Sequence, residues 1–163
     1  MSLAHERRCC ALQALFLADQ GGVADFDLVR GLFSARAGEL RDPSAPNEGE
    51  CDFSPAAVRD GIDWARRAWA VRAEADAAVQ ARTPDWPTHR QPTIDRNILR
   101  LGYWEIRHND TPVGVAIDEA VELAKAYGTE KSPAFVNAVL DALAKGAPDA
   151  PTAVDPSAPS AAE

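Results

Sequence analysis

Lysine, cysteine and long apolar runs are all scarce in this sequence of 163 residues. Only three lysines occur, all of them late in the chain, and the formal net charge is −8. Phosphate binding is driven largely by counterion release from basic side chains, so this balance argues against a protein that holds nucleic acid by bulk charge. Any contact with RNA has to be local.

The three cysteines do not form a metal site or a disulfide framework. Cys9 and Cys10 are adjacent, so on a helix they point about 100° apart and cannot hold one ion together. No Cys-x-x-Cys pair or histidine cluster is present. We therefore expect free thiols in a reducing cytoplasm, with no metal and no cofactor.

No apolar stretch approaches the roughly 20 residues that a membrane span requires. The apolar run after Arg8 is interrupted by Gln13 and is not followed by a small-x-small cleavage site, so it is interpreted as an amphipathic helix rather than a signal peptide. We expect no contact with a membrane.

Apolar residues recur at spacings of three and four, which predicts an all-helical protein. Ser54 and Pro55 give the clearest helix start, with Phe53 and Val58 placed to pack across it. Gly128 is expected to end a helix in the left-handed conformation, as the Gly21, Gly22 pair does for the first. Six helices are predicted, over about 2–19, 25–37, 54–82, 93–106, 111–128 and 132–146.

The expected helices divide the chain into one folded domain over 1–146, with lobes of about 1–82 and 93–146. Residues 38–53 have the composition of an acidic loop, and three prolines mark the connection between the lobes. Residues 147–163 are rich in Pro, Ala and Ser and lack large apolar side chains, so we expect a disordered tail. These patterns alone predict a six-helix globule and no function.

The segment from Ile94 to Asp141 resembles the NusB family, through the strings IDRNILRLGYWEI, DTPVGVAIDEAVELAKAYG and EKSPAFVNAVLD. The string RRCCALQALF is similar to the family's opening helix. The resemblance implies an all-α fold of two packed three-helix lobes. It also implies a transcription antitermination factor that binds boxA RNA of ribosomal RNA operons, together with NusE, within the RNA polymerase elongation complex.

The resemblance places candidate RNA-binding residues at both ends of the folded part. Arginine guanidinium groups suit phosphates and base edges, the Gln13 amide can meet a base edge, and aromatic faces can stack unpaired bases. A lysine beside exposed helix N–H groups can hold a phosphate. The predicted RNA-binding residues are Arg7, Arg8, Gln13, Phe16, Lys131 and Phe135.

Three alternatives stay open at this stage. For Phe16, core packing is favoured over base stacking, because Phe16 lies on the apolar stripe of its helix. The anionic surface also suits a helical protein-interaction module with weak or lost RNA binding, and self-association into a homodimer is undecided. An enzyme is not expected, because the sequence has no glycine-rich cofactor loop and its histidines are scattered.

Overall fold

The computed structural model describes residues 2–22, 24–38 and 53–146, and this part of the chain is all-helical, as predicted. The predicted acidic loop lies almost wholly, and the predicted tail wholly, outside the described residues. The helices are α1 (Leu3–Gly21), α2 (Phe26–Gly38), α3 (Pro55–Ala70), α4 (Arg72–Arg82), the short 3₁₀ helix η1 (Thr88–Arg90), α5 (Thr93–His108), α6 (Val113–Tyr127) and α7 (Ser132–Lys145).

Local capping residues fix several helix ends as the sequence predicts. The Ser2 hydroxyl accepts a hydrogen bond from the His5 N–H at 3.2 Å, and the Ser54 hydroxyl accepts one from Ala57 at the same distance. Gly22 ends α1 with a φ of 67°, in the left-handed region that glycine adopts without strain.

The ends around the α6–α7 turn differ from prediction. Gly128 is extended, with φ −90°, rather than left-handed. Glycine is needed there for space, because a Cβ would lie 2.6 Å from the Ser132 hydroxyl oxygen. Ser132 is the first residue of α7, and its hydroxyl accepts a hydrogen bond from the Thr129 N–H at 2.9 Å.

The prediction of a single helix over 54–82 is wrong, because the helix is interrupted at Val71, which has φ −105° and ψ 14°. Arg72 supports the break: its guanidinium donates to the Trp69 carbonyl at 2.9 Å and lies 4.3 Å from the centre of the Trp69 ring. The break lets α3 pack against α1 and α2 while α4 packs against α5 and α7. The division into lobes of about 1–82 and 93–146 stays a prediction.

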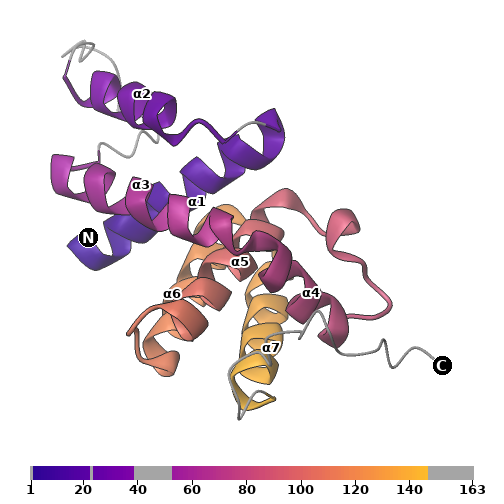
Figure 1. The fold of residues 1–163 in the computed structure, drawn as a ribbon. Coiled ribbons are helices and arrows are strands. Elements are labelled where there is room, and N and C mark those ends of the chain that lie inside the picture. Colours follow the sequence, from indigo (N-terminus) through magenta and orange to yellow (C-terminus); the bar gives the residue numbers. More distant parts are fainter. Residues whose placement is uncertain (1, 23, 39–52, 147–163) are drawn as a thin grey trace, which may run out of the picture.

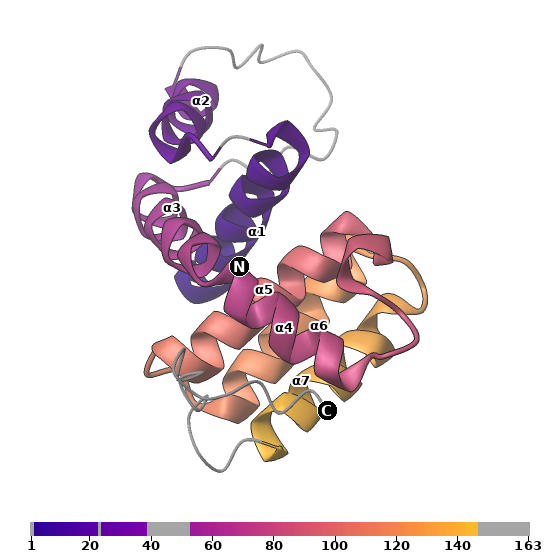
Figure 2. The same cartoon turned by 45° about the vertical axis from the view of Figure 1, so that its right-hand side comes forward.

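Helix α5 is at the centre of the molecule and packs against α1, α3, α4, α6 and α7 (Figures 1 and 2). Helices α1, α2 and α3 lie on one side of it, with α2 outermost, and α4, α6 and α7 lie on the other. The sequence predicts α5 to be apolar nearly all round, yet several of its buried residues are polar: Asp95, Asn97, Arg100 and Glu105. Charged groups at such depth require partners, and α1, α4 and α7 supply them.

Helices α1 and α3 approach closely where Gly61 faces α1. A Cβ at Gly61 would lie 2.7 Å from the Cys10 Cβ and 2.8 Å from the Arg7 carbonyl oxygen. Burial, with the nearby Cys9 and Glu6, raises the pKa of the Cys10 thiol to about 12, so this thiol is protonated at neutral pH. Within the described ranges, no helix has both the length and the apolar character needed to cross a membrane.

Candidate nucleic-acid interface

Three helix ends meet around the first turn of α5. The Gln20 amide, in the last turn of α1, donates to the Thr93 hydroxyl at 3.1 Å. Asp95, two residues into α5, is hydrogen-bonded to Ser132 at the start of α7. Burial raises the pKa of Asp95, and the Ser132 hydrogen bond only partly opposes this. The end of α1 and the start of α7 therefore flank the start of α5.

Helix α1 brings two of the predicted residues to this region. The Gln13 amide donates to the Tyr127 hydroxyl at 3.1 Å, which ties α1 to the last turn of α6. Phe16 follows three residues later, and Gln20 four residues after Phe16, so all three share one face of α1. Phe16 is half-buried and keeps part of its ring open.

The start of α7 brings two more of the predicted RNA-binding residues to this region. Lys131 occupies the cap position before α7 and is exposed. Phe135 lies one helical turn further and is half-buried, with its ring centre 4.8 Å from that of Trp86. An exposed cation and two aromatic rings thus lie together at the start of α7.

Arg8 does not belong to this group, and the structure gives it a different role from the one predicted. Its side chain is buried in an ion pair with Glu105 on α5, with Nη2 2.6 Å from Oε1 and Nε 3.1 Å from both carboxylate oxygens. Nη1 donates to the Ala4 carbonyl, and Thr111 also donates to Glu105. With 3% of its surface exposed, Arg8 is a structural residue that joins α1 to α5.

Arg7 lies beside it, and its guanidinium carbon is 4.0 Å from the centre of the Trp64 ring. The side chain is half-buried, so it keeps some contact with solvent. Arg7 precedes Phe16 by nine residues, or about 13 Å along a helix. The six predicted residues therefore divide into three places. Arg7 and Arg8 lie in the first half of α1, and Gln13 contacts the end of α6. Phe16, Lys131 and Phe135 lie on the end of α1 and at the start of α7, the two helix ends that flank the start of α5.

Asp19 anchors the other end of α1 on α5. Its Oδ2 accepts from Arg96 Nη2 at 2.7 Å and from the Asn97 amide at 3.0 Å, and it lies 3.2 Å from Arg100 Nη1. Burial alone would raise the pKa of Asp19, but hydrogen bonds from Arg96 and Asn97 and the charge of Arg100 hold it below 3.8. Arg100 is also paired with Asp76 of α4 at 2.7 Å.

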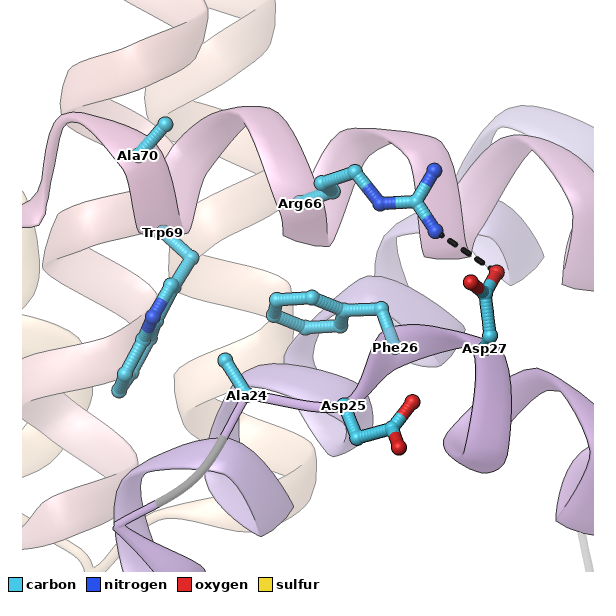
Figure 3. Close-up of a pocket in the computed structure, with 7 residues that line it drawn as sticks. All are labelled: Ala24, Asp25, Phe26, Asp27, Arg66, Trp69 and Ala70. Atoms are coloured by element: carbon cyan, nitrogen blue, oxygen red, sulfur yellow. Dashed lines mark hydrogen bonds and ion pairs between the residues drawn. The ribbon is translucent and has the colours of Figure 1, made fainter.

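An open hollow of about 640 Å³ lies elsewhere, between the start of α2 and the end of α3 (Figure 3). Phe26 and Trp69 form its apolar wall, and Asp25 and Asp27 lie along one side. Among the described residues that line it, the one cation is Arg66, which is paired with Asp27 at 3.0 Å. This acidic lining disfavours a phosphate chain.

Sequence reasoning missed Glu105 and Trp86. An acid inside an otherwise apolar helical string is a signal for a buried ion pair, since an unpaired charge at that depth is costly. Trp86 is surrounded by prolines, which indicated only a connection. In the described part of the chain, no group of three or more His, Cys, Asp or Glu side chains is placed to hold a metal ion.

The family model that matches this chain is that of the NusB family, over residues 5–145. The chain therefore belongs to the NusB family.

Two relatives illustrate the match. The transcription antitermination protein NusB of Anaeromyxobacter dehalogenans is 48% identical over 99 residues, which cover 61% of this chain and 65% of that protein. This match thus spans slightly less than two thirds of the relative's length. The NusB of Sorangium cellulosum is 37% identical over 139 residues, covering 85% of this chain and 89% of that one.

Solved structures share the fold. T. maritima NusB superposes with a TM-score of 0.69 at 27% identity, covering 93% of this chain and 94% of that one. A structure of the antitermination factors NusB and NusE in complex with double-stranded RNA gives a TM-score of 0.67 at 24% identity, with 90% of this chain and 98% of that chain covered.

Proposed function

We propose that this protein is a transcription antitermination factor that binds boxA-type RNA of ribosomal RNA operons together with NusE. It would act in the cytoplasm on the RNA polymerase elongation complex, as a regulator rather than an enzyme. The observation that supports the proposal, in a chain of this family, is that hydrogen bonds hold both the end of α1, the helix of Phe16, and the start of α7, the helix of Phe135, against the start of α5. Lys131 directly precedes α7.

Each of these groups has a role that suits unpaired RNA. The half-open rings of Phe16 and Phe135 offer faces on which bases stack, a contact that is worth roughly 1–3 kcal/mol per base. The exposed ammonium group of Lys131 can pair with a phosphate between the stacked bases. The Gln13 amide, already bonded to Tyr127, can present its oxygen to a base edge.

Because few cations are available, we expect a small electrostatic contribution. Contacts to about two to four phosphates would make log affinity fall against log salt with a slope of roughly −1.4 to −3 for single strands, and more steeply for a duplex. NusE would add affinity that this anionic protein lacks when it is alone.

The test is binding of labelled boxA RNA and of a scrambled RNA of equal length, each measured with and without NusE across a salt series. Preference for boxA, increased by NusE, is the expected result. Equal affinity for the two RNAs in both conditions would overturn the proposal. The size of the free protein in solution, measured in the same buffers, decides whether it forms a homodimer.

Lys131 offers a direct test of the proposed site. Lys131→Ala should weaken RNA binding and make the salt slope shallower by about 0.7, the value for one phosphate of a single strand. Lys145→Ala is the matched control, because Lys145 is exposed at the far end of the same helix and paired with Asp141 at 2.9 Å. Equal effects of the two substitutions would contradict a local phosphate contact at Lys131.

A protein-interaction module without RNA binding is the second candidate, and the burial of Arg8 favours it. The ion pair with Glu105 removes one of the few cations of α1 from solvent. Capture of NusE by this protein without measurable affinity for boxA RNA is the result that this alternative predicts.

A further inference from the structure

The connection between α4 and α5 presents an aromatic ring that the proposed RNA site does not yet include. Trp86 is 38% exposed although it is a large apolar side chain. Its ring centre lies 4.8 Å from that of Phe135, with the two planes inclined at 58°. Phe135 in turn packs against the hydrophobic core, so the pair is anchored on one side and open on the other.

Hydrogen bonds hold the backbone around Trp86 in place. The Trp86 N–H donates to the Thr83 carbonyl, and the buried Gln91 amide donates to the Trp86 carbonyl, both at 3.0 Å. Gln80 closes the other side of the loop: its amide nitrogen donates to the Thr83 carbonyl at 3.2 Å, and its oxygen accepts from the Thr88 N–H at 3.1 Å. A ring carried by so constrained a loop loses little freedom when a ligand stacks on it.

Charge around the ring is balanced. Asp85 and Arg90 are exposed on the same connection, and Glu130 and Lys131 are exposed just before α7. Their formal charges cancel, so attraction of a phosphate chain does not explain an open tryptophan here. A planar, uncharged group is the ligand that the surface fits, and an RNA base is such a group.

We propose that Trp86, whose ring packs at an inclined angle against Phe135, is a further stacking position for an unpaired base of the bound RNA. The inference rests on the proposed function, because it extends the group formed by Phe16, Lys131 and Phe135 across the start of α7 onto the α4–α5 connection. The RNA then passes over more of the protein than the residues of α1 and α7 alone allow.

The experiment compares the wild-type protein with Trp86→Ala and Trp86→Phe, bound to NusE, in titrations of boxA RNA. Trp86→Ala should weaken binding roughly 5- to 100-fold, while Trp86→Phe, which keeps a ring, should stay within about threefold of wild type. Since stacking releases no counterions, the salt slope of Trp86→Ala should equal that of wild type. Leu28→Ala, which trims a 60% exposed side chain on α2, should change nothing.

Tryptophan fluorescence gives a second measurement that does not require boxA specificity. Single-stranded oligouridine at low salt should quench the emission of wild type, and the quenching should be lost in Trp86→Phe, which keeps the other three tryptophans. Thermal melts of each variant separate loss of the ring from loss of the fold, and Trp86→Phe keeps the test decisive if Trp86→Ala unfolds.

The outcomes are distinguishable. Wild-type affinity in Trp86→Ala, or a loss confined to NusE binding, overturns the inference and leaves the proposed function intact. Quenching by oligouridine that depends on Trp86, with no preference for boxA, supports the stacking position and rejects the antitermination proposal. Absence of RNA binding by the wild-type protein rejects both.

Discussion

Replacement of Arg8 by alanine is the sharpest test of the structural role assigned to that arginine. The change leaves the Glu105 carboxylate, which is 2% exposed, without the guanidinium that contacts both of its oxygens. Removal of one partner from a buried pair costs about 3–5 kcal/mol, because the remaining charge is left desolvated. For a chain of this size that loss lowers the melting temperature by roughly 10 °C.

Thermal and urea unfolding, followed by circular dichroism, measure the effect, and Arg7→Ala is the matched control. Arg7 is half-buried over the Trp64 ring, a contact worth about 0.5–1 kcal/mol. The double variant Arg8→Ala, Glu105→Gln should recover part of the lost stability, since it removes the unpaired charge. Equal melting temperatures for Arg8→Ala and Arg7→Ala, or no recovery in the double variant, would refute the buried-pair argument.

Two further substitutions probe how α1 is held. Asp19→Asn should cost about 2 kcal/mol at pH 7, because it weakens the contacts with Arg96 and Arg100. The folded-state pKa of Asp19 is lowered, so its contribution to stability is complete above 3.8 and is lost as the pH falls through the folded value. Urea unfolding should therefore show the stabilities of wild type and variant converging as the pH falls below 3.8. Gly61→Ala should destabilise by about 1–3 kcal/mol in the same assay, because its methyl group would lie 2.7 Å from the Cys10 Cβ, and a wild-type midpoint would contradict this close approach.

Features that depend on neighbouring residues were predictable from the sequence. Ser54 and Pro55 define the start of α3, and Gly22 ends α1, because a cap or a left-handed turn is decided within a few residues. The break at Val71 was not predictable, since the residues around it include no proline or glycine. Tertiary packing decides it: both helices contact α5, but α3 also packs on α1 and α2, whereas α4 also packs on α7.

The candidate site, like the fold, could be predicted from the sequence only in part. Phe16 and Phe135 are found from family strings, and the structure places them on helix ends that flank α5. Arg7 and Arg8 look equivalent in the sequence, yet one is half-buried over Trp64 and the other is enclosed. Their difference depends on a carboxylate 97 residues away, a separation that no local pattern reports.

The two ion pairs that join α1 to α5 have opposite charge order: α1 supplies the cation in one pair and the anion in the other. Arg8 meets the acidic Glu105 near the end of α5, whereas Asp19 meets the basic Arg96 near its beginning. Were α1 to dock head-to-tail reversed, like charges would confront each other at both anchors, in surroundings where repulsion is poorly screened. The two ion pairs therefore hold α1 on α5 and also fix its orientation, because they form only when the two helices pack antiparallel.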